Sequence, residues 1–226
     1  MKVLVIIQGH YRSFDKTVDS WMESLKNCDF EFRISVFDRI DHNTVCWWKG
    51  EGQETPLLTL AQIETLKKLD PGVEIITQYL SPEERADLYA HKPLKSHYYR
   101  YNAWKKILEN IDETKYDVIV LSRPDVLIKD IDFNNLSIEV DEIKVCGRSD
   151  PNRVNGLAGT DVICAIHPKN KDVFYDVPSD FVHRKFISGE DSFNDFIFKK
   201  FGKVDLYWSW GKEYEIYEVC NGRGIY

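Results

Sequence analysis

The strongest structural signal in the chain is an apolar run, Val118 to Leu121, that ends abruptly at Ser122-Arg123-Pro124-Asp125. Uninterrupted Val, Ile and Leu residues are typical of a strand that is covered on both faces, as in parallel α/β sheets. Ligands of such sheets bind outside the carboxyl ends of the strands. Arg123 and Asp125 are therefore expected at a ligand site. Because Pro and Asp are also common turn formers, a purely conformational role for this segment stays open.

Strands and helices alternate through the rest of the chain. Short apolar or alternating runs predict strands at Val3–Ile7, Phe30–Phe37, Val73–Thr77, Ile143–Cys146 and Val162–Ile166. Apolar residues three and four positions apart predict helices on Phe14, Val18, Trp21, Met22 and Leu25, on Leu60, Ile63, Leu66 and Leu69, on Tyr101, Trp104, Leu108 and Ile111, and on Phe193, Phe196, Ile197 and Phe201. Ser81-Pro82-Glu83-Glu84 predicts a further helix start. This order predicts an α/β fold with an open sheet. The segment after Phe201 shows no clear period.

Composition narrows the class of protein. The chain has 226 residues, of which 43% are hydrophobic, enough for one core, and we expect a single domain over 1–226. The Val3–Ile7 run is too short for a membrane span or a signal-peptide core, so a cytoplasmic protein is expected. The five cysteines lack Cys-x-x-Cys spacing, which argues against a zinc site or a disulfide scaffold. The formal charge of −7 weakens the case for a nucleic-acid partner without excluding it.

Four segments contain the polar residues that follow the predicted strands or open a helix: Gln8-Gly9-His10-Tyr11-Arg12, Val36-Phe37-Asp38, the expected helix over Ser96–Lys106, and the stretch from Tyr116 to Val126. Together they resemble GT-A-type glycosyltransferases of microbial or viral origin. The resemblance implies a Rossmann-like, mostly parallel central sheet flanked by helices. It assigns 1–128 to nucleotide-sugar binding and 129–226 to acceptor binding.

The resemblance also implies the residues that hold a nucleotide-sugar donor. Ser122-Arg123-Pro124-Asp125 stands where that family carries an Asp-X-Asp motif, which binds a divalent metal, Mn²⁺ or Mg²⁺, against the diphosphate. Asp125 is then the metal ligand. Arg123 replaces the first acid, which puts full metal dependence in doubt, since arginines can also supply the positive charge. The donor-binding residues implied are Gln8, Gly9, Arg12, Asp38, Arg100, Arg123 and Asp125.

The second half is expected to bind the acceptor. Glu190-Asp191 resembles the acidic pair of many inverting members, so Asp191, or failing it Glu190, is the expected general base. Acids also favour helix starts on dipole grounds, and that explanation stays open. Acceptor contacts are expected from Asp161, at the end of the polar loop Gly147–Asp161, and from Trp208 and Trp210, which are otherwise core aromatics.

The function expected from this resemblance is transfer of a hexosyl or pentosyl group from a nucleotide-sugar to a hydroxyl acceptor. A bacterial surface glycan is the first acceptor class. Hydroxymethylated cytosine in phage DNA is an alternative, and a non-catalytic nucleotide- or glycan-binding α/β module is a second one.

Overall fold

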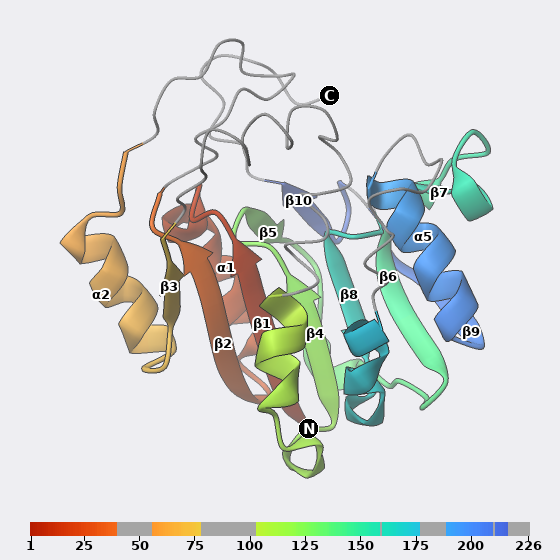
Figure 1. Ribbon diagram of the computed structural model, residues 1–226, viewed down its shortest axis with the longest axis horizontal. Coiled ribbons are helices and arrows are strands. Elements are labelled where there is room, and N and C mark those ends of the chain that lie inside the picture. Colours follow the sequence, from red (N-terminus) through yellow and green to blue (C-terminus); the bar gives the residue numbers. More distant parts are fainter. Residues whose placement is uncertain (40–55, 78–102, 159, 177–188, 210, 217–226) are drawn as a thin grey trace.

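The computed structural model describes residues 1–39, 56–77, 103–158, 160–176, 189–209 and 211–216, with the backbone alone at 176 and 189–192. Its main sheet has the strand order β3-β2-β1-β4-β8-β6-β7, and β9 also pairs with β6 (Figure 1). Among the described residues, β5 and β10 form a second sheet. The strands are β1 (Lys2–Gly9), β2 (Asp29–Phe37), β3 (Glu74–Ile76), β4 (Val118–Ser122), β5 (Val126–Ile128), β6 (Glu142–Ser149), β7 (Leu157–Ala158), β8 (Ile163–Ile166), β9 (Lys203–Ser209) and β10 (Tyr214–Ile216).

Strand direction decides which residues meet at an edge of the sheet. β1 is parallel to both β2 and β4, and β2 is parallel to β3. β8 runs against β4 and β6, while β9 is parallel to β6. The carboxyl ends of β1, β2, β3, β4, β6 and β9 therefore share one edge, where β8 begins. This mostly parallel sheet flanked by helices confirms the predicted fold class.

Helices cover both faces of the sheet. The helical elements are α1 (Phe14–Leu25), α2 (Leu60–Leu69), a helix over 103–109, α5 (Gly189–Lys200) and the 3-10 turns η1 (Glu113–Lys115), η2 (Phe133–Asn135), η3 (Val154–Gly156) and η4 (Pro168–Asp176). In Figure 1, α1 lies behind the sheet, and the 103–109 helix, η4 and α5 lie in front of it.

Each face of the central strands has its own core. Alternate residues of β1 and β4 belong to different clusters: Val3, Val5, Ile7, Val118 and Val120 pack with α1, whereas Leu4, Ile6, Ile119 and Leu121 pack with Trp104, Phe174 and Phe193. All of these side chains are buried. Burial on both faces is why these two strands are continuous apolar runs and do not alternate with polar residues.

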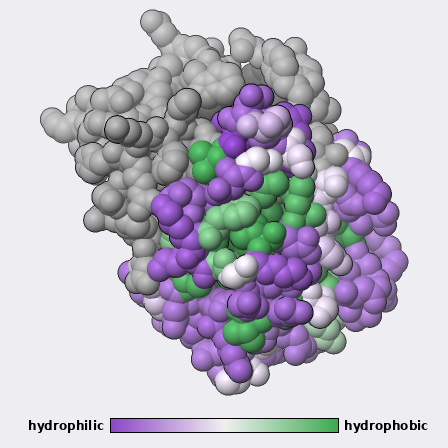
Figure 2. All heavy atoms as spheres, turned by 90° about the vertical axis from the view of Figure 1, so that its right-hand side faces the viewer, coloured by the Kyte–Doolittle hydropathy of each residue, from purple (hydrophilic) through white to green (hydrophobic). Residues whose placement is uncertain are grey.

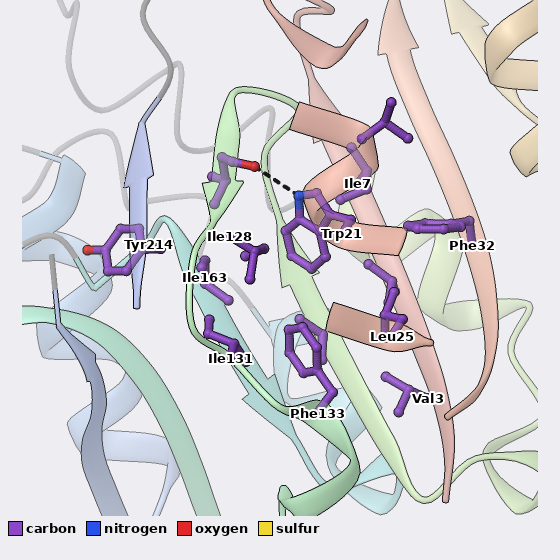
Figure 3. Close-up of a cluster of buried hydrophobic side chains, with 14 of the residues drawn as sticks. Val3, Ile7, Trp21, Leu25, Phe32, Ile128, Ile131, Phe133, Ile163 and Tyr214 are labelled. Atoms are coloured by element: carbon purple, nitrogen blue, oxygen red, sulfur yellow. Dashed lines mark hydrogen bonds between the residues drawn. The ribbon is translucent and has the colours of Figure 1, made fainter. Parts of the chain in front are cut away.

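One face of α1 is joined to the segment that follows β4. The Thr17 hydroxyl donates to the Pro124 carbonyl at 2.6 Å, and the Trp21 indole N–H donates to the Val126 carbonyl at 2.9 Å (Figure 3). The Ser20 hydroxyl accepts from the Ile128 backbone N–H at 3.0 Å. Positions three and four apart on a helix share a face, so the three bonds form one row along β5.

Some predicted features differ from the structure. Met22, expected on the buried face of α1, is 38% exposed, and Leu60, the first residue of α2, is 82% exposed. The segment after Phe201 contains β9 and β10, which the sequence did not reveal. The helix expected from Ser81 lies outside the described residues.

β9 is an edge strand within the described part of the chain, because its only partner there is β6. Figure 2 views the side of the molecule on which α5, β7 and β9 lie, and green residues gather near its middle within a purple surround. Phe198 of α5 is 41% exposed, and Val204 and Leu206 of β9 are half-buried against the core. This surface therefore combines an open strand edge with partly exposed apolar side chains.

No helix in the described ranges combines the length and the apolar character that a bilayer crossing requires.

Replacing Thr17 with Val is expected to lower the free energy of unfolding by about 1–2 kcal/mol, because the buried Pro124 carbonyl loses its donor while the side-chain shape is kept. Urea denaturation would measure the change. Thr65→Val is the matched control, since the exposed Thr65 hydroxyl donates to the Ala61 carbonyl within α2. Equal effects of the two substitutions would show that the bond between α1 and Pro124 adds no specific stability.

Candidate functional site

Most of the site residues predicted from the sequence converge on the edge where the parallel strands end. Gln8 and Gly9 close β1, and Asp38 follows β2. Ser122, the last residue of β4, is paired with Ile7 on one side and with Ile163 on the other. Because Asp161 precedes β8, it belongs to the same edge. The edge therefore collects the residues of both expected halves, donor and acceptor.

The backbone between β1 and α1 has two unusual conformations. Gly9 has φ 137°, a value that disfavours any side chain, and a Cβ there would lie 3.4 Å from Pro124 Cδ. Arg12 has φ 45°, in the left-handed region that a non-glycine residue adopts at a cost of about 1–2 kcal/mol. This loop therefore runs close to Pro124 and turns sharply at Arg12.

Asp125 lies between two guanidinium groups. Its carboxylate accepts from Arg12 Nη1 at 2.5 Å and from Arg123 Nε at 2.9 Å, and Arg123 Nη2 also donates to it. The Asp125 side chain is 2% exposed, and those of Arg12 and Arg123 are 23% and 18% exposed. These residues thus form a largely buried cluster that links the loop after β1 to the loop after β4.

The two arginines determine the protonation of Asp125. Burial by itself raises the pKa of this carboxyl, but the charges and hydrogen bonds of Arg123 and Arg12 outweigh burial and hold the pKa well below its ordinary value. Asp125 is therefore an anion at every pH at which the protein is expected to work.

The surroundings of Asp125 do not suit a metal ion. Each carboxylate oxygen already accepts from a guanidinium, and a cation placed beside them would meet two positive charges. Within the described ranges, no group of three or more His, Cys, Asp or Glu side chains has an arrangement that could hold a metal. The divalent metal implied by the family resemblance stays a prediction.

The other donor residues have simpler surroundings. Gln8 is 3% exposed. The backbone N–H of Asp38 donates to the Ile76 carbonyl at 2.9 Å, and its carbonyl accepts from Leu58 N–H at 2.8 Å, so β3 and the segment before α2 fix its backbone position. Its roles toward ribose or base stay a prediction. Arg100 lies outside the described residues.

On the acceptor side, Asp161 and Trp208 are both largely buried. Asp161 is 8% exposed, and Trp208 is 2% exposed and packs against Phe133 with ring centroids 6.2 Å apart. This burial favours the core alternative for Trp208, although its side chain also lines a hollow of about 300 Å³ with Tyr207 and Glu213. The contacts predicted for Asp161 and Trp208 are untested.

Glu190 and Asp191 lie in the first turn of α5, where only the backbone is described. The chain reverses direction between α5 and β9. Because β9 ends at Trp208 and Ser209, at the carboxyl edge of the sheet, the first turn of α5 lies towards the same edge. α5 therefore begins near the edge that holds the donor residues, as contacts from Asn155 to Asn194 also indicate. The base assignment stays a prediction, and Trp210 lies outside the described residues.

Asn194 is a structural residue of this site that the sequence did not indicate. It is fully buried, donates to the Leu157 carbonyl at 2.7 Å and accepts from the Thr160 hydroxyl. It thereby ties α5 to the loop that ends at Asp161. The sequence feature that could have identified Asn194 is an amide on the apolar face of a helix, among Phe193, Phe196 and Ile197. Thr17 and Ser20 on α1 carry the same kind of signal.

Comparison with known proteins gives a match in structure but not in sequence. Neither family models nor curated protein sequences match the chain. The galactosyltransferase LgtC in complex with donor and acceptor sugar analogues superposes with a TM-score of 0.51 at 13% identity, covering 91% of this chain and 72% of that one, and an active-site mutant of LgtC gives the same values. A glycosyltransferase involved in glycosylation of the major capsid of PBCV-1 superposes at 0.45 with 12% identity, over 91% and 82% of the two chains. The superposition on LgtC shows that the fold matches that of a GT-A-type glycosyltransferase.

Asp125→Asn is expected to lower the free energy of unfolding by about 3 kcal/mol near neutral pH, because two guanidiniums lose their buried counter-charge. The pKa of Asp125 is lowered in the folded state, so its stabilisation is present above the ordinary carboxyl pKa of about 4 and is lost as the pH falls towards the lowered value. The difference between wild type and variant should therefore shrink below about pH 4.

Urea denaturation of both proteins at neutral and at acid pH would measure this difference. Glu23→Gln is the control, because Glu23 is 70% exposed and pairs only at the surface with Lys26. A difference that stays constant down to about pH 3 would show that the charge of Asp125 does not stabilise the fold.

Proposed function

We propose that this chain is a glycosyltransferase that moves a sugar from a nucleoside-diphosphate sugar to a hydroxyl acceptor. The observation that carries the proposal is the cluster of Arg12, Arg123 and Asp125 at the carboxyl edge of β1 and β4, in a sheet that matches the GT-A fold. Open α/β sheets bind their ligands at this edge. Arginine side chains there suit a diphosphate, because their planar forks form paired hydrogen bonds with phosphate oxygens.

The donor is proposed to lie over the ends of β1, β2 and β4. Gly9 lets the backbone approach the β4 loop, and Asp38 is proposed to accept hydrogen bonds from the nucleoside. Arg12 and Arg123 stabilise the negative charge that develops on the diphosphate as the bond to the sugar breaks. Gln8 and Arg100 complete the proposed donor set.

The acceptor is proposed to enter from the side of α5 and Asp161. In an inverting reaction, Asp191 removes the proton from the acceptor hydroxyl while its oxygen attacks the anomeric carbon, and the nucleoside diphosphate leaves with the electron pair of the broken bond. Glu190 is the alternative base. Trp208 and Trp210 are proposed to contact the acceptor sugar.

A bacterial surface glycan is the acceptor class that we propose. The formal charge of −7 gives no general attraction to DNA, which disfavours the alternative of a modified phage base. A cytoplasmic location and hexosyl transfer, with pentosyl transfer as the other possibility, complete the proposal.

Incubation with a panel of nucleotide-sugars, with and without Mn²⁺, tests the proposed activity. Release of nucleoside diphosphate from one or more donors is expected, and it should increase when the correct acceptor is added. Binding of a nucleotide-sugar without turnover under any of these conditions would instead support the non-catalytic module.

Asp191→Asn is expected to reduce sugar transfer by about 10²- to 10⁴-fold while leaving donor affinity unchanged, because a general base acts on the acceptor and not on the diphosphate. Product release and calorimetric donor binding would be measured on the same protein. Asp195→Asn is the control, one turn further along α5, where Asp195 pairs with Lys199. Retained transfer with a lowered melting temperature would leave Asp191 as an acid that only stabilises the helix start.

A further inference from the structure

We infer that Asp125 is a positioning residue that holds Arg12 and Arg123 as a fixed cationic pair for a diphosphate, so that donor binding requires no divalent metal. This inference rests on the proposed function, because the diphosphate is that of the proposed donor. It differs from the family resemblance, which makes the same carboxylate a metal ligand.

The charges of Arg12, Arg123 and Asp125 favour an anion over a cation. One carboxylate is shared between two guanidiniums, so the three side chains together carry a net charge of +1 in a largely buried place. Arg is fully protonated at any working pH, and the lowered pKa of Asp125 keeps the carboxylate ionised. The guanidinium of Arg123 would attract an anion bound beside it, whereas it would repel a divalent cation.

Part of the Arg123 guanidinium faces away from Asp125. Its Nε and Nη2 atoms face Asp125, and the described part of the chain gives this guanidinium no other acceptor. Nη1 and the second N–H of Nη2 are therefore left for a ligand, on a side chain that is 18% exposed. A guanidinium fixed along one edge presents its remaining donors in a defined direction, which suits a phosphate group.

The backbone of Arg12 has a left-handed conformation. Its φ of 45° is costly for a non-glycine residue, and such conformations persist where the surrounding structure requires them. The contact with Asp125 is 2.5 Å long and joins residues from the loops after β1 and β4. The strained turn thus places Arg12 on the carboxylate that also orients Arg123.

Calorimetric titration with inorganic pyrophosphate in the presence of EDTA tests the inference directly. Wild type is expected to bind. Arg123→Gln should weaken binding by about 10- to 100-fold, the factor expected for a lost charge-assisted hydrogen bond, and Arg123→Lys should fall between them because it keeps the charge but not the planar fork. Arg33→Gln is the matched control, since Arg33 pairs with Glu31 in the middle of β2. It should bind like wild type.

Asp125→Asn separates a positioning residue from a metal ligand. If Asp125 holds the two guanidiniums, the folded variant binds pyrophosphate in EDTA up to about tenfold more weakly than wild type, and added Mn²⁺ changes the affinity of both proteins equally. Binding that Mn²⁺ strengthens in wild type but not in the variant would show that Asp125 is a metal ligand. Melting curves recorded on each variant ensure that only folded protein is titrated.

Two results would overturn the inference. One is wild-type protein that binds pyrophosphate only after Mn²⁺ or Mg²⁺ is added. The other is unchanged affinity in both Arg123 variants. Failure of the proposed function is recognised separately: pyrophosphate would bind in EDTA as expected, but no nucleotide-sugar would be turned over with any acceptor.

Discussion

The row of hydrogen bonds between α1 and the segment after β4 fixes the position of the candidate site. Thr17, Ser20 and Trp21 bind backbone groups of Pro124, Ile128 and Val126, so the helix and the β5 strand cannot shift relative to each other without breaking buried bonds. Arg12 lies two residues before α1 and Asp125 immediately before β5. Their ion pair is therefore held at both ends by the same packed unit.

The sheet beneath this unit is rigid because β1 and β4 are buried on both faces. Their alternate side chains belong to two separate cores, and Trp21 stacks on Phe133 in one of them with ring centroids 5.8 Å apart. A shift of either strand would open cavities on both sides at once, at a cost of several kcal/mol. The loops that follow these strands thus start from fixed points, which is a requirement for precise placement of charged groups.

Local signals in the sequence were sufficient for the central strands and for α1, α2 and α5, because each has a strong apolar pattern. β9 and β10 were not predicted. In β9, Val204, Leu206 and Trp208 alternate with Lys203, Asp205 and Ser209, but the aromatic Tyr207 interrupts the polar positions and the strand is only partly buried. The site was predictable only as a set of strand ends. The pairing of Arg12 with Asp125 joins residues 113 positions apart, and the sequence alone gives no register for such a contact. Asn194 carries only a weak signal in the sequence, an amide on the apolar face of a helix, and its partners lie 34 or more positions away.

A metal site and an arginine pair differ in how their charges balance before any ligand binds. A metal site gathers several carboxylates, which repel one another until the ion arrives, and the protein must stabilise that repulsion. In the cluster of Arg12, Arg123 and Asp125, one carboxylate bonds to both guanidiniums, so they keep their positions when nothing is bound. Donors that are oriented before the ligand arrives need little reorganisation during the reaction. A lone acid at the place of an Asp-X-Asp motif therefore suits the proposed donor site, in which arginine side chains supply the positive charge.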